Sequence, residues 1–389
     1  MILFTKPIAA ERLRMAYNND IIRFYSNLPG QTLYAEVALK SSGSDADIFR
    51  LRLYPDPQGK FFLNLKPYVI SLINTRNFED TLETAIDPGD VSTYVYPFTE
   101  GTYYNRNLHI TVMHEGDTQS NGTYNLTWLA GVEQLGDYHT FRTSDVVVLS
   151  PLKKATNSHY YLKYWQGYPF DLAFYANDKD FTLKNTTLHM ERNMRIAGYI
   201  TRLFFSDGST DEVIDNLLPL VEGRNELVMA FNGRSLSLRY KTPCISVEKV
   251  PYKCGVYLKW LNKYGGYSYW LFENTWSLDR SSKYTGEVDR DNANLDEMFG
   301  RTAQLGKESQ ETVKVVAEHL NEEERGIVEG LVDSPKIYLF TGKPFSRSSS
   351  RDWIEVTLKN TNVRLKNAKQ PLVNFAFDFE LPLRYVQTL

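Results

Sequence analysis

Short runs in which apolar and polar residues alternate recur along most of the chain, and they predict a protein built mainly from β-strands. The segment 48–65 alternates on both sides of a Pro-Asp-Pro-Gln-Gly sequence, which predicts a β-hairpin. The segment 199–214 has the same form around the Asp-Gly pair at 207–208. Further short runs of this kind lie at 109–116, 123–132 and 144–151. Regular short strands separated by turn residues are typical of β-sandwiches and barrels.

Two sequence elements recur in the same order, and they predict two related β-modules in tandem. The first element contains Asn-Leu-x-Pro-x-Val, at 64–69 and again at 216–221. The second is a Tyr-Leu-Lys run rich in aromatic residues, at 161–175 and again at 257–272. The first copy has a longer insertion, about residues 76–158, between its elements. Chance similarity between strand-rich segments is the alternative.

The region after residue 285 has a different pattern, which predicts an α+β unit. Apolar residues at helical spacing predict a helix over about residues 309–332. These residues are Val313, Val316, Ala317 and Leu320. Asn321 followed by Glu324 is a capping-box sequence, so we expect a second helical turn to begin there.

Strands resume after Pro335, and the whole pattern divides the chain into four parts. The later runs lie at 336–342, 352–360 and 371–382, and the last alternates phenylalanine with polar residues. The predicted parts are the start of a β-module at 1–75, a β-rich insertion that completes this module at 76–196, a second β-module at 197–285, and an α+β unit at 286–389. The predicted fold class is mainly β, with tandem β-sandwich-like modules followed by a sheet with one inserted helix.

The segment 257–272, YLKWLNKYGGYSYWLF, is unusually rich in aromatic residues. Placing Gly265-Gly266 in a two-residue turn predicts a hairpin in which Tyr264 faces Tyr267. Neither face of that hairpin is clearly polar, although a sheet with one face in water shows a polar side. Both faces could be buried within the domain, one face could contact a neighbouring subunit, or the rings could form a sugar platform. The candidate interface residues are Tyr257, Trp260, Tyr264, Tyr267, Tyr269, Trp270 and Phe272.

Composition and charge narrow the function classes. The chain has 389 residues, too many for one ordinary core, and 14% of them are Phe, Trp or Tyr. Such residues favour strands and are enriched at interfaces. The net charge is −3, with Lys and Arg spread along the chain, so we expect no nucleic-acid binding. The N-terminus lacks a signal-peptide core and no stretch is long enough to cross a bilayer, so we expect a soluble protein with no membrane segment.

The potential metal ligands show no recognisable spacing. His109 and His114 are five residues apart on one predicted strand, which places them on opposite faces, and His319 lies in the predicted helix. We therefore expect no metal site and no cofactor. Cys244 and Cys254 do not imply a disulfide framework, although one bridge within a hairpin is an alternative.

One polar segment, 288–300, has aspartates at the first and third positions of a calcium loop. Asn294 stands where such a loop needs glycine, and Gly300 stands where it needs glutamate. This segment is therefore expected to be a solvated loop.

Catalytic motifs are also absent from the sequence. There is no nucleophile elbow, no Walker loop and no dinucleotide fingerprint. Asp171 and Glu273, which lie next to aromatic residues, are candidates for the carboxylates of a glycoside hydrolase. Charges that protect strand edges are the favoured explanation. We therefore expect no catalytic residues and no enzymatic activity.

Four phrases resemble virion proteins of tailed bacteriophages and prophages of Bacteroidetes. They are LYPDPQGKFFLNLKPYVISLIN, YWQGYPFDLAFY, YLKWLNKYGGYSYWLFE and WIEVTLKN…NFAFDFELP. The resemblance implies a structural protein of the tail tip or baseplate, similar to a distal-tail protein. It further implies a homo-oligomeric ring that links the tail tube to the adsorption apparatus, with tube, hub and fibre proteins as partners. The implied location is the virion, after assembly in the host cytoplasm. The alternative is a carbohydrate- or receptor-binding tail protein that uses the loops of 76–158 and the aromatic residues near WQGYPF.

Overall fold

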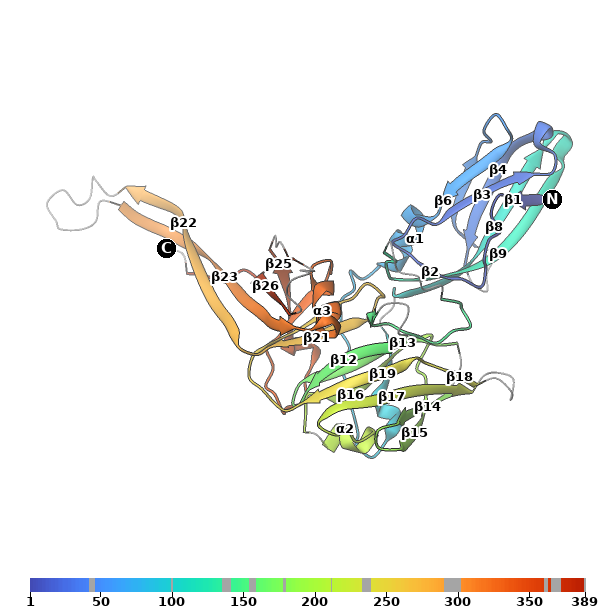
Figure 1. The fold of residues 1–389 in the computed structure, drawn as a ribbon. Coiled ribbons are helices and arrows are strands. Elements are labelled where there is room, and N and C mark those ends of the chain that lie inside the picture. The colour runs from blue at the N-terminus through green and yellow to red at the C-terminus, as the bar shows by residue number, and fades with distance from the viewer. Residues whose placement is uncertain are drawn as a thin grey trace.

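The strands form three β-rich units, and a long two-stranded arm projects from the C-terminal one (Figure 1). The structure is a computed structural model. It describes residues 1–41, 46–98, 101–134, 141–153, 159–177, 180–210, 212–232, 239–289, 302–359, 363–364 and 372–387. Its predominance of strands confirms the predicted mainly β fold class. Within those residues, no helix combines the length and the apolar character needed to span a bilayer.

The N-terminal unit is a sandwich of a five-stranded sheet, in the order β2-β9-β8-β4-β5, and a three-stranded sheet, β1-β3-β6. Its elements are β1 (Ile2–Phe4), β2 (Leu13–Met15), β3 (Ile21–Ser26), β4 (Thr32–Lys40), β5 (Asp47–Leu53), β6 (Lys60–Asn64), α1 (Lys66–Ile73), β8 (Tyr103–His114) and β9 (Gln119–Leu129). Both sheets contribute to one core: Phe24 and Phe61 stack at 4.9 Å, and Val37, Leu108 and Trp128 are fully buried beside them. We call this unit the N-terminal sandwich.

The predicted hairpin over 48–65 is wrong in its pairing. The turn itself forms, because the Asp56 side chain accepts hydrogen bonds from the backbone nitrogens of Gln58 (2.9 Å) and Lys60 (2.8 Å). However, β5 pairs with β4 while β6 pairs with β3, so the chain crosses from one sheet to the other at this turn. Alternation on both sides of a turn does not distinguish a paired hairpin from such a crossing.

The central unit is also built from two sheets, in the orders β10-β13-β16-β7 and β11-β12-β19-β17-β14-β15, with β18 beside β17. Its elements are β7 (Val95–Pro97), β10 (Val147–Val148), β11 (Leu152–Lys153), β12 (His159–Trp165), β13 (Pro169–Tyr175), β14 (Asp180–Asn185), β15 (Met190–Arg195), β16 (Ile200–Asp207), α2 (Glu212–Leu217), β17 (Gly223–Asn232), β18 (Arg239–Lys241) and β19 (Cys244–Val250). The predicted hairpin over 199–214 is wrong, because β16 ends in a turn at Gly208 (φ 90°) and the chain continues into α2.

The C-terminal unit is one seven-stranded sheet in the order β21-β20-β24-β25-β26-β23-β22. Its elements are β20 (Val256–Leu261), β21 (Tyr267–Phe272), β22 (Thr275–Asp289), β23 (Thr302–Leu320), α3 (Glu322–Val328), β24 (Ile337–Phe340), β25 (Trp353–Leu358) and β26 (Val373–Glu380). Short 3₁₀ turns lie at Pro29–Gln31, Val91–Tyr94, Glu115–Asp117, Glu329–Leu331 and Ser350–Asp352. This sheet shares one continuous hydrophobic core with the central unit, and we call the two together the body.

The predicted helix over 309–332 is wrong in its first half, where β23 extends to Leu320. The burial in this strand has period two, since Val313, Val315 and Ala317 are buried in the core. Val313 and Ala317 are four residues apart, a spacing that fits both a helix and a strand, whereas Val316 lies on the other face of β23. The capping-box prediction is confirmed: the Asn321 side chain accepts from the nitrogens of Glu323 and Glu324, and α3 begins there.

The sheets cross the predicted boundaries between the four parts. Strand β8 pairs with β4, and β9 pairs with β8, so this portion of the predicted part at 76–196 completes the N-terminal sandwich as expected. Strands β12 to β15 of the same part lie in the central unit. Strands β20 and β21, from the predicted second module at 197–285, belong to the C-terminal sheet. The two aromatic segments of the predicted repeat also differ, since β12 and β13 lie in separate sheets whereas β20 and β21 pair with each other.

Candidate functional site: the projecting β-arm

The aromatic hairpin at 257–272 forms, but with a different register from the predicted one. Leu261 pairs with Tyr267, and the loop between the strands holds a tight turn in which Gly265 N donates to Asn262 O at 2.9 Å. Gly265 has φ 84°, and the Asn262 side chain accepts from Tyr264 N at 2.9 Å. An asparagine three positions before a glycine in a left-handed conformation is typical of this longer hairpin loop. This signal was present in the sequence.

All seven candidate interface residues are buried inside a single copy of the chain. Their exposed fractions range from 0% for Trp260 to 5% for Tyr267, Tyr269 and Trp270. The rings of Trp165 and Trp270 are 5.1 Å apart, and Tyr257 lies 4.6 Å from Tyr168. The hairpin is thus enclosed between the central unit and the rest of its own sheet. Burial of both faces within the domain describes this segment, and a subunit contact through these side chains does not.

The Gly265-Gly266 pair lies where the N-terminal sandwich meets the body. A Cβ atom on Gly266 would lie 2.2 Å from Leu149 O, and one on Gly265 would lie 2.6 Å from Ala130 O. Next to them, Val132 N donates to Lys263 O at 2.6 Å. The two glycines therefore form the turn and also allow three backbone segments to pack closely together.

Replacing Gly266 with alanine is expected to lower the free energy of unfolding by about 1–3 kcal/mol, because the added methyl group must displace backbone. Urea unfolding measures this change. The matched control is Gly326→Ala in α3, where no atom lies within 4 Å of the added Cβ and a helical alanine is favoured. Equal unfolding midpoints for the two variants would contradict the close packing at this turn.

A cluster of charged side chains is buried beneath the aromatic hairpin. Arg202 of β16 donates from Nε and Nη2 to the Asp171 carboxylate, both at 2.9 Å, and from Nη1 to Asp80 at 2.8 Å. Lys259 of β20 donates to the other Asp80 oxygen at 2.7 Å, and the Tyr269 hydroxyl donates to Asp171. Each of the four charged side chains is at most 4% exposed: Arg202, Asp171, Asp80 and Lys259. We call these residues the buried ion cluster.

The cluster is electrically balanced. Burial alone raises the pKa of the Asp80 carboxyl, but the charges of Arg202 and Lys259 outweigh burial and hold this pKa well below its ordinary value. Asp171 has both oxygens engaged and a fully buried side chain, so it is not open to a substrate. Glu273, the other hydrolase candidate, accepts from Trp165 Nε1 at 2.7 Å and from Lys253 Nζ at 2.5 Å.

The remaining candidates from the sequence are three histidines, two cysteines and the calcium-like loop. His114 is buried and lies 3.2 Å from the hydroxyls of Ser26 and Ser120, while His109 lies on the other face of β8, as predicted. His319 is in β23 with φ 54°, not in a helix. Cys244 and Cys254 are free thiols. The calcium-like loop at 288–300 lies outside the described residues after Asp289.

The aromatic residues near WQGYPF form no exposed ring platform. Trp165 is fully buried, and Tyr168 and Phe170 are each 2% exposed. The sugar site expected there under the alternative function is thus enclosed by the protein itself.

Among the described residues, the rest of the chain leaves the outer strand of the arm formed by β22 and β23 largely uncovered. Nearly every residue of β22 is exposed, whereas the other strands of this sheet bury at least one face. Three large apolar side chains at even-numbered positions of β22 are half exposed or more: Trp276 (50%), Leu278 (53%) and Tyr284 (64%), with Arg280 and Ser282 between the last two. They lie on one face, because all are separated by even numbers of residues. We call this row the arm stripe.

The arm stripe continues the core face of the C-terminal sheet. Trp276 is paired with Val315 and Leu278 with Val313, and these valines are in turn paired with Phe377 and Phe379 of β26. The two valines and two phenylalanines are buried, but the stripe on the adjoining strand is not. Strand β22 also ends the sheet, so within the described residues its outer edge has no strand partner.

Comparisons with known proteins do not assign the chain to a family. No protein-family model matches the chain, and no curated protein matches it. Among solved structures, one similar chain is described as a tetra-tandem repeat in the extending region of a large adhesion protein. It is 9% identical, with a TM-score of 0.23, over 98% of this chain and 73% of that one. So low a score carries no conclusion about fold or function.

Proposed function

We propose that the protein is a structural subunit of a multi-copy assembly and that the arm joins each copy to a neighbouring copy. The observation that carries this proposal is the arm stripe, three exposed apolar side chains on one face of an open-edged strand, which the described part of the same chain leaves largely uncovered. Exposed apolar rows of this kind mark interaction surfaces. Beyond the pair Arg280–Glu311 the described part of the arm has no third strand. A two-stranded ribbon without a packing layer is marginal in water, so this part of the arm gains stability when a neighbour covers it.

The edge of β22 supports a selective contact rather than indiscriminate aggregation. The strand offers unpaired backbone donors and acceptors along 15 residues, which suits addition of a strand from another chain. Asp279, Arg280 and Lys283 are interspersed with the apolar residues, and charges on an edge strand discourage pairing with the wrong partner. A partner must therefore match both the apolar and the charged positions.

The kind of assembly we propose is a ring in the tip or baseplate of a phage tail, similar to a distal-tail protein. The support is the resemblance of four sequence phrases to tail proteins, together with the mainly β fold in several units. An arm on one copy that contacts a different surface on the next is a head-to-tail contact, and such contacts form rings when the rotation closes. Tail tube, hub and fibre proteins are the other partners under this proposal.

Light scattering coupled to size-exclusion chromatography tests the proposal on the full chain. We expect an oligomer, and we expect the triple variant Trp276→Ser, Leu278→Ser, Tyr284→Ser to weaken association at least about a hundredfold. Each side chain is already about half buried, so its contact contributes about 1 kcal/mol, and the loss of all three accounts for that factor.

The matched control removes three exposed apolar residues from the N-terminal sandwich. These residues are Leu33 (47%), Tyr54 (72%) and Phe62 (56%). This control variant should assemble like the wild type. A monomeric wild type at high concentration, or an arm variant that still assembles, would overturn the proposed role of the arm.

A further inference from the structure

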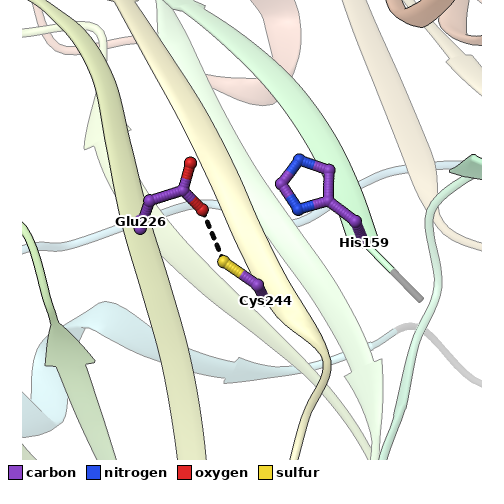
Figure 2. A group of neighbouring side chains, drawn as sticks. All are labelled: His159, Glu226 and Cys244. Atoms are coloured by element: carbon purple, nitrogen blue, oxygen red, sulfur yellow. Dashed lines mark hydrogen bonds between the residues drawn. The ribbon is translucent and has the colours of Figure 1, made fainter. Parts of the chain in front are cut away.

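Three potential metal ligands meet on the seven-stranded sheet of the central unit (Figure 2). His159 is on β12, Cys244 on β19 and Glu226 on β17, and these strands are neighbours in the sheet. One nitrogen, one sulfur and one carboxylate oxygen lie within 4.8 Å of one another. All three residues are partly buried, so the group is reachable from solvent.

Strand register brings the three side chains to the same face. His159 is paired directly with Cys244, and Glu226 is paired with Ser246, two positions along β19 from Cys244. The residues next to the three along their strands, Tyr160, Leu227 and Ile245, are buried in the core on the opposite face. The backbone of a paired sheet is rigid, and the ligand positions are therefore set before any ion arrives.

The donor atoms suit zinc. Zn²⁺ takes sulfur at about 2.3 Å and nitrogen or oxygen at about 2.0–2.2 Å, with a preference for four ligands in a tetrahedron. Bound donor atoms are then roughly 3.3–3.8 Å apart, so side-chain rotations of about 1 Å bring the present group into range. The Glu226 carboxylate is already oriented, because Ser246 Oγ donates to its Oε1 at 3.0 Å while Cys244 Sγ donates to its Oε2.

We propose that His159, Glu226 and Cys244 bind one Zn²⁺ ion, with a water molecule as the fourth ligand. Binding replaces the S–H bond of Cys244 with an S–Zn bond and releases that proton to solvent. The ion ties β12, β19 and β17 together on the outer face of the central sheet. This site is independent of the arm and of the assembly proposed above.

Arg224 on β17 opposes the ion. Its Nη2 lies 3.5 Å from His159 Nε2, which leaves Nδ1 as the ring nitrogen for the metal. A metal on Nδ1 places the ring proton on Nε2, so the contact from Arg224 is lost. The guanidinium keeps its bonds to the Glu323 carboxylate, at 3.1 and 3.0 Å. Arg224→Gln removes a nearby positive charge and is expected to tighten Zn²⁺ binding about 3- to 10-fold.

Cobalt titration of the untagged, chelator-stripped full chain tests the site. We expect one Co²⁺ per chain, a thiolate-to-cobalt charge-transfer band in the near ultraviolet, and displacement of the band by Zn²⁺. Cys244→Ser should abolish the band, and Cys254→Ser, which changes the other, exposed thiol, should keep it. His159→Ala and Glu226→Gln should each weaken binding at least about tenfold.

A second readout does not depend on cobalt. Excess Zn²⁺ should raise the melting temperature of the wild type and of Cys254→Ser but not of Cys244→Ser, because a ligand that binds only the folded state stabilises it. Circular dichroism without metal should show that Cys244→Ser remains folded. A wild type without the charge-transfer band, or a band that depends on Cys254, would overturn the proposed site.

Discussion

Arg202→Met is expected to lower the free energy of unfolding by about 3–5 kcal/mol, one of the largest effects of any single substitution in this protein. The substitution leaves Asp171 with the Tyr269 hydroxyl and Asp80 with Lys259, so the enclosed site gains an uncompensated negative charge. Such a charge cannot be screened by water at this depth, which explains the size of the expected loss. Denaturant unfolding followed by tryptophan fluorescence measures it.

The control for this prediction is Arg195→Met at the edge strand β15. Arg195 is 73% exposed at its side chain and lies 3.6 Å from Asp180, so its loss should change the free energy by no more than about 0.5 kcal/mol. The double variant Arg202→Met, Asp171→Leu should be less destabilised than Arg202→Met alone, because it removes the stranded carboxylate. If the double variant has a lower free energy of unfolding than Arg202→Met alone, the arginine acts through packing rather than charge.

Trp260→Ala is expected to cost about 3–5 kcal/mol, because the indole is fully buried and its removal leaves a large cavity. Trp260→Phe should cost less than half as much. The indole Nε1 is buried and, among the described residues, has no hydrogen-bond acceptor. A buried donor without an acceptor costs about 1–3 kcal/mol. Phenylalanine removes this penalty while it keeps most of the packing.

Thermal unfolding of the two Trp260 variants, compared with the wild type, tests this prediction. The order wild type, phenylalanine, alanine is expected for the melting temperatures. Equal losses for phenylalanine and alanine would mean that the indole nitrogen has a partner which stabilises the native state.

Local patterns in the sequence predicted the strands better than their partners. The runs at 109–116, 123–132 and 371–382 each form strands, because alternation reports one buried face. Alternation does not report which strand lies alongside, so the crossing at Asp56 and the helix after Gly208 were both mistaken for hairpins. The helix prediction failed because Val313 and Ala317 are compatible with a period of two or of four.

The sequence carries a recognisable signal for the buried ion cluster. Each of its three strand residues is a single charge inside an apolar run: Asp171 in PFDLAFY, Arg202 in ITRLFF and Lys259 in VYLKWL. Lone charges of opposite sign in buried strands must find one another, so such runs predict a buried network. The proposed zinc ligands had no equivalent signal, because their proximity depends on the order β12-β19-β17, which joins distant parts of the chain.

The Gly265-Gly266 turn helps to set the angle between the N-terminal sandwich and the body. The N-terminal sandwich extends on one side of the body and the arm on the other (Figure 1). A Cβ atom on Gly265 would meet Ala130 O, just after β9 of the sandwich. We expect a methyl group on Gly265 to push Ala130 away and tilt the sandwich, and a tilt at this end becomes a larger displacement at the far end. Where many copies repeat the same angle between sandwich and body, the error recurs with each copy. The geometry of a whole array then depends on the absence of side chains at this turn.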